Sequence, residues 1–170
     1  MVMAQPLLSL LHQQQDVRVG VLALPWIKPL LQRMPGVDDI VDMPIGHGRL
    51  ALGERYRIGK SLRGRYAQCI VLPNSLKSAL IPWFAKIPRR TGYTGEARLG
   101  LLNDRRQLDA VAMPRLVSRY AALASPAGQA DEPGNPVLQV GPDHLQQTLA
   151  DLAIAAGEQP ILGLCPGAEY

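Results

Sequence analysis

Short apolar runs that alternate with segments of helical periodicity are the feature that most constrains the fold of this chain. The run VRVGVLAL at 17–24 is rich in β-branched residues, and AQCIVLPN at 67–74 is almost continuously apolar. Both runs have the length and composition of buried strands. Weaker strands are predicted at 37–43 and 86–93. This alternation predicts an α/β fold in which helices cover both faces of a parallel sheet.

The clearest helix begins after Ser75, which we expect to be its N-cap. Leu76, Leu80 and Trp83 follow at a spacing that forms one apolar stripe, so we assign Trp83, with Phe84 and Trp26, to the core. Further helices are predicted at 26–34, 54–65, 116–124 and 145–156, and the chain also opens on a helical pattern. The segment 104–109 is predicted to be a turn.

Composition excludes several classes of protein. The chain of 170 residues has two cysteines, Cys69 and Cys165, too few for a disulfide scaffold. No apolar run reaches the length of a membrane span. His12, His47 and His144 lack the spacing of metal ligands, so we expect no metal site. The Pro- and Gly-rich segment 125–136 is a predicted linker between residues 1–124 and 137–170.

The formal charge of +4 conceals a strong asymmetry. Residues 49–106 contain 13 Lys and Arg against three acids, a net charge of +10, and the remainder carries −6. Such a concentration favours an anionic partner, which at this point could be a phosphate, a sugar acid, nucleic acid or an anionic membrane. Aromatic residues are few and do not alternate with the basic ones, so a nucleic-acid platform is disfavoured.

Two segments in this basic region are candidate sites. LPNSLKSA at 72–79 places Ser75, Lys77 and Ser78 at a strand end and a helix start, where free backbone N–H groups attract anions. Its alternative is a capped helix with one solvated lysine. PRRTGYTGEARLGLLND at 88–104 joins arginines that can grip phosphate or carboxylate to Glu96. Its alternative is a polar loop with surface ion pairs.

Four segments of the chain resemble, in order and spacing, the heptosyltransferase II group of glycosyltransferase family 9, the ADP-heptose:lipopolysaccharide heptosyltransferases. They are MPIGHG, VLPNSLKSAL, IPRRTGYTGEARLGLLND and LCPGAEY. The resemblance covers nearly the whole chain and is weakest at 125–136. It implies the Rossmann-like N-terminal half of a GT-B glycosyltransferase that lacks its first strand. Residues 1–124 are then the acceptor-binding domain, and 137–170 are an interdomain helix and the first strand of a donor-binding domain.

The resemblance also implies the reaction. The family transfers heptose from ADP-L-glycero-D-manno-heptose to the inner core of lipopolysaccharide, inverts the anomeric centre and uses neither a metal nor another cofactor. The implied acceptor is a phosphorylated Kdo-heptose lipid A, and nucleic acid is not an expected partner. The implied location is the cytoplasm, peripheral at the inner membrane.

The residues expected to contact the acceptor lie in three groups. The expected general base, an Asp, precedes Met1, and the expected catalytic Lys follows Tyr170, so no catalytic residue is assigned and we expect the chain alone to be inactive. Two alternatives stay open: a non-catalytic anion-binding module for acidic lipid or nucleic acid, and a heptosyltransferase for another acceptor position. The expected acceptor contacts are Lys60 and Arg63 in the basic helix, Asn74, Ser75, Lys77 and Ser78 at the strand end, and Arg89, Arg90, Thr91, Glu96 and Arg98 in the following loop.

Overall fold

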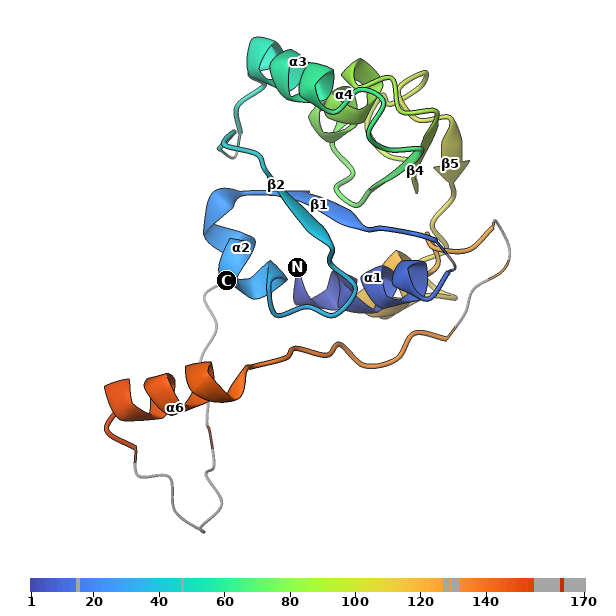
Figure 1. The fold of residues 1–170 in the computed structure, drawn as a ribbon. Coiled ribbons are helices and arrows are strands. Elements are labelled where there is room, and N and C mark those ends of the chain that lie inside the picture. Colours follow the sequence, from blue (N-terminus) through green and yellow to red (C-terminus); the bar gives the residue numbers. More distant parts are fainter. Residues whose placement is uncertain (15, 47, 127–128, 130–131, 155–162, 164–170) are drawn as a thin grey trace. The chain divides into compact units, whose positions relative to one another are not determined.

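The computed structural model describes residues 1–14, 16–46, 48–126, 129, 132–154 and 163 (Figure 1). The chain divides into two compact units, Met1–Leu138 and Gln139–Tyr170. His47, Cys165, part of the predicted linker and the predicted strand near 161 lie outside the described residues. The first unit contains every strand found among the described residues.

Two parallel sheets form the centre of the first unit (Figure 1). In the smaller one, β1 (Gly20–Ala23) pairs with β2 (Asp39–Asp42), and Gly20 lies opposite Asp39. In the larger one, the order is β3 (Gln68–Val71), β4 (Arg89–Tyr93) and β5 (Asp104–Arg106). All three strand pairs are parallel, which confirms the α/β class with parallel pairing.

The structure differs from the predicted strands in two respects. The strands form two sheets instead of one, because no strand among the described residues pairs with both β1 and β3. The prediction of a turn at 104–109 is wrong for Asp104–Arg106, which forms β5. This polar strand lies at a sheet edge, and the carboxylate of Asp104 compensates the charges of its arginine neighbours.

Each predicted helical segment overlaps an observed helix, but the ends differ by several residues, and positions 155–156 of the predicted segment 145–156 lie outside the described residues. The opening segment forms a 3₁₀ turn and α1, and the segment after β1 forms a second 3₁₀ turn that continues into α2. In the second unit, α6 has no buried residue. The bounds are η1 Val2–Ala4, α1 Gln5–His12, η2 Pro25–Ile27, α2 Lys28–Leu31, α3 Leu52–Ser61, α4 Leu76–Phe84, α5 Leu116–Ala121 and α6 Pro142–Asp151.

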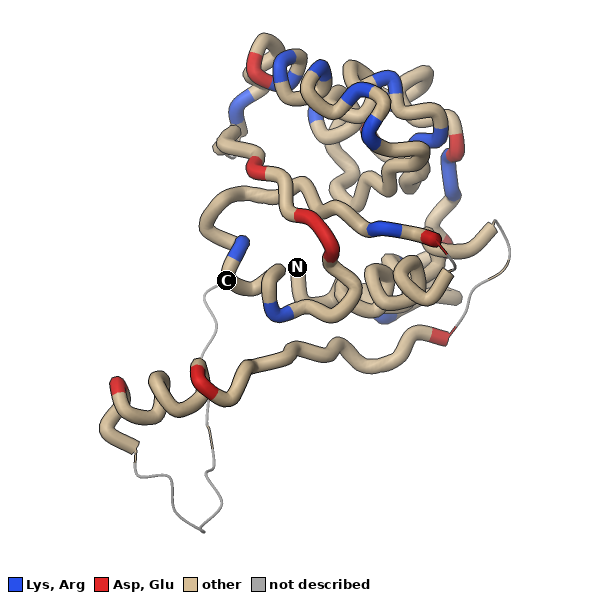
Figure 2. The backbone as a smooth tube through the Cα atoms, in the orientation of Figure 1, with Lys and Arg blue, Asp and Glu red and all other residues tan. Residues whose placement is uncertain are grey.

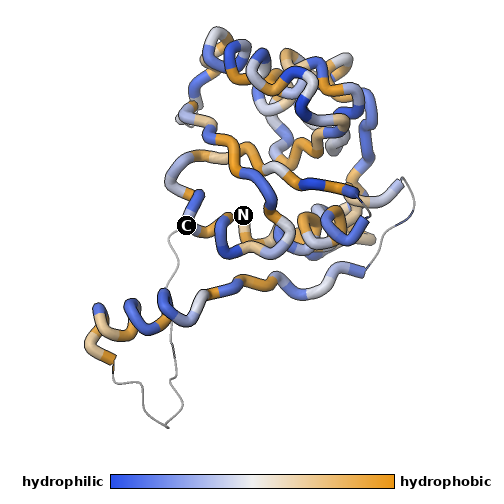
Figure 3. The backbone as a smooth tube through the Cα atoms, in the orientation of Figure 1, coloured by the Kyte–Doolittle hydropathy of each residue, from blue (hydrophilic) through white to orange (hydrophobic). Residues whose placement is uncertain are grey.

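One apolar cluster connects the two sheets of the first unit. The buried residues Leu62, Ile81 and Ile87, beside β3 and β4, pack against Leu22 of β1 and Val41 of β2. In Figure 3 hydrophobic residues lie on both β1 and β2. The sheets are therefore held together by side-chain packing, since the described strands form no backbone ladder from one sheet to the other.

Tyr66 links the same two sheets at their beginning. Its hydroxyl donates to Asp39 Oδ2 at 3.2 Å. A Cβ atom at Gly20 would lie 2.7 Å from that hydroxyl oxygen, so any larger residue at position 20 would displace the Tyr66 ring. Burial raises the pKa of the Tyr66 phenol, so the group stays protonated and able to donate well above neutral pH.

The prediction that Trp26 and Trp83 belong to the core is wrong. Trp83 is 45% exposed and Trp26 is 72% exposed. The buried face of α4 is centred on Ala79–Pro82, so Trp83 lies at its margin. Trp26 lies in the 3₁₀ turn η2, where α-helical spacing does not determine which side chains are buried.

Helices α3 and α4 pack closely because α3 carries a glycine at their contact. A Cβ atom at Gly59 would lie 2.6 Å from Phe84 Cβ and 2.9 Å from the Ile81 carbonyl oxygen. The neighbours on α4 include backbone atoms, which cannot rotate away as a flexible side chain can. The α3–α4 contact therefore requires glycine at position 59.

We predict that Gly59→Ala lowers the free energy of unfolding by about 1–3 kcal/mol, because it overpacks the helix contact. Gly53→Ala in the same helix is the matched control, since nothing lies within 4 Å of its Cβ position. This control should be neutral or stabilising by up to about 1 kcal/mol. Urea unfolding measures both, and equal stability of the two variants would contradict the close contact.

Candidate functional site

Hydrogen bonds within the loop and from the segment after β4 hold the loop between β3 and α4 in place. The Ser78 hydroxyl bonds to the carbonyl oxygen of Ser75 at 2.6 Å. Ser75 occupies the N-cap position, but its side chain makes no capping bond. Instead, the Leu76 N–H donates to Glu96 Oε2 at 2.8 Å. The predicted Ser75 cap is thus replaced by a carboxylate from the segment after β4, which suits the positive end of the helix.

Arg98 fastens the same loop to the end of β4. Its guanidinium donates to the Pro73 carbonyl oxygen at 2.7 Å, to Asn74 Oδ1 at 3.3 Å and to the Tyr93 carbonyl oxygen. The side chain is buried, and burial lowers its pKa below the usual arginine range. Gly95 permits this close approach, since a Cβ there would lie 2.8 Å from the Asn74 carbonyl oxygen.

A second buried arginine supports the first turn of α4 from the other side. Arg55 donates from Nη1 to the Lys77 carbonyl oxygen at 3.0 Å and from Nε to the Leu50 carbonyl oxygen at 2.7 Å. The side chain of Lys77 is half-buried, and none of the ion pairs between described residues involves it. Its ammonium therefore has no counter-ion among the described residues and is available to an external anion.

Arg89 and Thr91 lie elsewhere, along β4, where Asp104 binds both. Asp104 Oδ2 accepts from Arg89 Nη2 at 3.0 Å and from the buried Thr91 hydroxyl at 3.0 Å. Arg106 donates to the two carboxylate oxygens at 2.8 and 3.0 Å. These bonds, that from Arg106 foremost, lower the pKa of Asp104 to about 2. This network offsets part of the positive charge on β4 and β5.

Arg63 and Arg90 lie at a third place, a pocket of about 520 Å³ between α3 and the end of α4. The Arg90 guanidinium donates to the carbonyl oxygens of Leu101 at 2.6 Å and Ile87 at 2.5 Å. Lys60 is exposed on α3. The structure thus brings together six of the predicted residues, Asn74, Ser75, Lys77, Ser78, Glu96 and Arg98, and leaves Lys60, Arg63, Arg89, Arg90 and Thr91 apart from them.

Most of the basic residues of the chain nevertheless share one region. Figure 2 shows Lys and Arg gathered on α3 and on the segments around α4, β4 and β5. The predicted site at the start of α4 therefore lies in a positive field. The sequence analysis did not assign Arg55 or Asp104 a role in supporting the region. The sequence marks them only as single charged residues among many in the basic segment.

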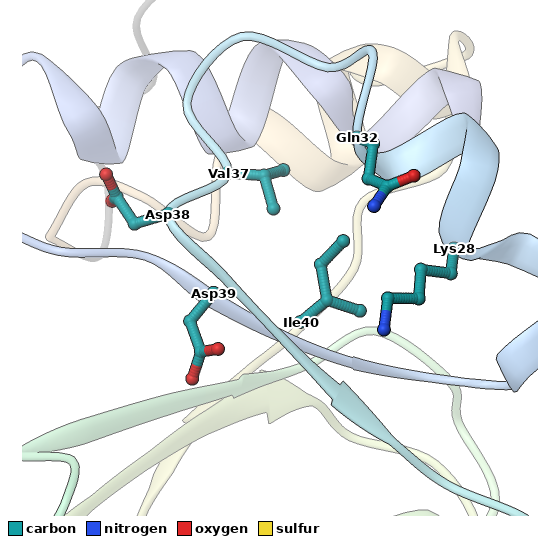
Figure 4. Close-up of a pocket in the computed structure, with 6 residues that line it drawn as sticks. All are labelled: Lys28, Gln32, Val37, Asp38, Asp39 and Ile40. Carbon is teal, nitrogen blue, oxygen red and sulfur yellow. The ribbon is translucent and has the colours of Figure 1, made fainter.

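A different pocket, of about 370 Å³, is lined by Lys28, Asp38 and Asp39 among others (Figure 4). Its carboxylates already have partners. Asp38 Oδ2 accepts from the Val19 N–H at 2.6 Å, which lowers the pKa of Asp38, and Asp39 binds Arg65. None of the predicted contact residues lines this pocket, so it does not compete as the candidate site.

The described part of the chain contains neither a metal-binding cluster nor a membrane-spanning helix. No cluster of three His, Cys, Asp or Glu side chains in it could hold a metal ion. No helix in it is both long and apolar enough to cross a bilayer.

Comparison with known proteins gives the same class throughout. The family model for glycosyltransferase family 9 (heptosyltransferase) matches residues 55–170. The chain is 49% identical over 160 residues to lipopolysaccharide heptosyltransferase 2 of Salmonella typhimurium, covering 89% of this chain and 46% of that protein. It is 46% identical over 179 residues to the Escherichia coli enzyme of the same name, covering 100% of this chain and 51% of that protein.

A solved structure agrees. The structure of E. coli ADP-heptose lps heptosyltransferase II matches with a TM-score of 0.86 at 42% identity, over 99% of this chain and 51% of the other. The chain belongs to glycosyltransferase family 9 and is a homologue of lipopolysaccharide heptosyltransferase 2. It spans about half the length of the curated relatives it matches.

We predict that Asp104→Asn lowers the free energy of unfolding by roughly 2 kcal/mol at pH 7, because the depressed pKa stabilises the folded state. The stabilisation is complete above the carboxyl's unfolded pKa near 4 and is lost as the pH falls toward 2. The difference between wild type and variant should therefore shrink over that interval.

Urea unfolding at pH 7, 4 and 2 measures this difference. Asp42→Asn, at an exposed position of β2, is the control and should change stability little. A constant difference between Asp104→Asn and wild type across the three pH values would contradict the proposed role of the Asp104 carboxylate.

Proposed function

We propose that this chain is the acceptor-binding part of a heptosyltransferase that transfers heptose from ADP-L-glycero-D-manno-heptose to the inner core of lipopolysaccharide. The acceptor is a phosphorylated Kdo-heptose lipid A, approached at the cytoplasmic face of the inner membrane. Membership of the family supports this reaction. The observation that carries it is the free, half-buried Lys77 at the start of α4, within the cluster that also contains Asn74.

The chemistry of this cluster suits that acceptor. Phosphates and Kdo carboxylates are anions, and a lysine ammonium next to an amide can bind and orient them. The cluster follows the carboxyl ends of β3 and β4, which is where parallel α/β sheets bind ligands. Glu96 and Arg98 act in this proposal by fixing the loop, since both are engaged with its backbone.

We further propose that the two sheets belong to one Rossmann-like sheet with room for a strand between β1 and β3. β1 and β3 are each an edge strand of their sheet. Their middle residues, Leu22 and Ile70, are only half-buried. Central strands of parallel sheets are normally buried on both faces. The apolar cluster beside Leu22 already joins the two sheets, which supports their being parts of one layer.

The domain organisation stays a proposal as well. Residues 1–124 are assigned to acceptor binding, and 137–170 to an interdomain helix and the beginning of a donor-binding domain that holds most of ADP-heptose. The helix α6 in the second unit supports this assignment.

Binding of a deacylated, phosphorylated Kdo-heptose oligosaccharide, measured by calorimetry, tests the proposal. Lys77→Gln should weaken binding about tenfold, because it removes one charge-assisted contact to the anion. Lys28→Gln, the same change beside the smaller sheet, is the control and should leave the affinity unchanged.

Three results would count against the acceptor site. These are no binding by the folded wild-type chain, equal weakening by both lysine variants, or salt-sensitive binding of arbitrary DNA that the oligosaccharide does not displace. The last result would favour the anion-binding module.

A further inference from the structure

An exposed aromatic and basic surface lies on α3 and the last turn of α4, away from the first turn that carries Lys77. Tyr56 of α3 is 44% exposed and Trp83 of α4 is 45% exposed. The Phe84 ring joins them, with ring centres 5.4 Å from Tyr56 and 5.1 Å from Trp83. We call this set, with Arg63 and Lys86 at its rim, the aromatic–basic surface.

The charges around this surface are almost all positive. Arg63 lies 5.9 Å above the centre of the Tyr56 ring and donates to the Phe84 carbonyl oxygen at 3.1 Å. Lys60 and Lys86 are exposed beside it. Glu54 is the only acid between residues 49 and 90, and it faces Arg49 at 3.9 Å. The surface therefore attracts an extended anionic partner.

The aromatic geometry favours a lipid surface over nucleic acid. The Tyr56 and Phe84 rings meet edge to face at 85°, and the Trp83 ring is tilted by 60° to Phe84, so the three rings do not form a flat stacking platform. Successive bases of a single-stranded nucleic acid stack on open aromatic faces, and here Arg63 lies over the face of the Tyr56 ring. Exposed Trp and Tyr with basic neighbours are instead typical of the interface between water and lipid headgroups.

Exposed leucine extends the apolar part of the surface along α3. Leu52 is 51% exposed and precedes Tyr56 by one helical turn, on the same side of the helix. Such exposed apolar side chains next to lysine and arginine can enter the headgroup region while the cations contact lipid phosphates.

We propose that the aromatic–basic surface docks on an anionic phospholipid bilayer, with Trp83 and Tyr56 among the headgroups and Arg63 and Lys86 on lipid phosphates. The inference rests on the proposed function only in that a lipid-anchored acceptor requires an approach to a membrane. Lys77 and Trp83 lie six residues apart on α4, about 9 Å along the helix axis. Docking would therefore hold the candidate acceptor site close to the headgroups.

The two tryptophans of the chain allow a direct test with the full chain. Trp26→Phe leaves Trp83 as the only tryptophan, and Trp83→Phe leaves Trp26, which lies beside the smaller sheet. We expect the fluorescence of Trp83 to shift to the blue and to be quenched by brominated lipid on adding vesicles of phosphatidylcholine and phosphatidylglycerol. Trp26 should show neither effect, and vesicles of phosphatidylcholine alone should give a much weaker response.

Matched charge variants test the basic rim by vesicle sedimentation. Lys86→Gln should reduce partitioning to anionic vesicles about fivefold, the effect expected of one basic side chain near such a surface. Lys28→Gln should not reduce it. Circular dichroism confirms that each variant is folded.

The proposal is overturned if Trp83 and Trp26 respond alike, if Lys86→Gln and Lys28→Gln partition alike, or if the chain binds DNA but not anionic vesicles. Vesicles contain no Kdo or heptose, so their binding does not depend on the acceptor site. Conversely, the deacylated oligosaccharide forms no bilayer, so failure of the acceptor proposal would appear only in the oligosaccharide-binding experiment.

Discussion

The buried guanidinium of Arg98 is the interaction on which the candidate site depends. It binds oxygen atoms of Pro73 and Asn74 on one side and of Tyr93 on the other, and so joins the ends of β3 and β4. Of these residues Tyr93 is buried, and a buried carbonyl group left without a donor costs about 1–3 kcal/mol. Because Arg98 fixes the loop, Glu96 reaches the first N–H of α4, that of Leu76. Lys77 follows in the first turn, with its ammonium free of ion pairs among the described residues.

The sequence predicted those parts of the fold that follow from apolar patterning. The runs at 17–24 and 67–74 contain β1 and β3, because short runs of β-branched and apolar residues bounded by turn residues favour strands. It did not predict β5, because Asp104–Arg106 is a polar segment that becomes a strand through pairing with β4 and through the Asp104 network. Nor could patterning show that the strands form two sheets.

For the site, the sequence indicated the region and the kind of charge but not the task of each side chain. The basic region and the segment 72–79 were identified from charge and from the strand-to-helix transition. Residue type alone does not reveal that Arg90 and Arg98 bind backbone carbonyl oxygens, or that Arg89 binds Asp104. Trp83 was misplaced for a related reason: an apolar stripe indicates a face of a helix, and the partner that covers that face is set by tertiary packing.

Helix α4 thus carries two distinct surfaces, a cationic first turn and an aromatic last turn, and the central claim concerns the first. Chemical-shift mapping of the isotopically labelled chain with the deacylated, phosphorylated Kdo-heptose oligosaccharide tests that claim most directly. We expect the largest shifts at the backbone amides of 74–78 and 94–98, and small shifts in β1 and β2. Shifts spread evenly over the basic residues, or confined to the smaller sheet, would contradict an acceptor site at the start of α4.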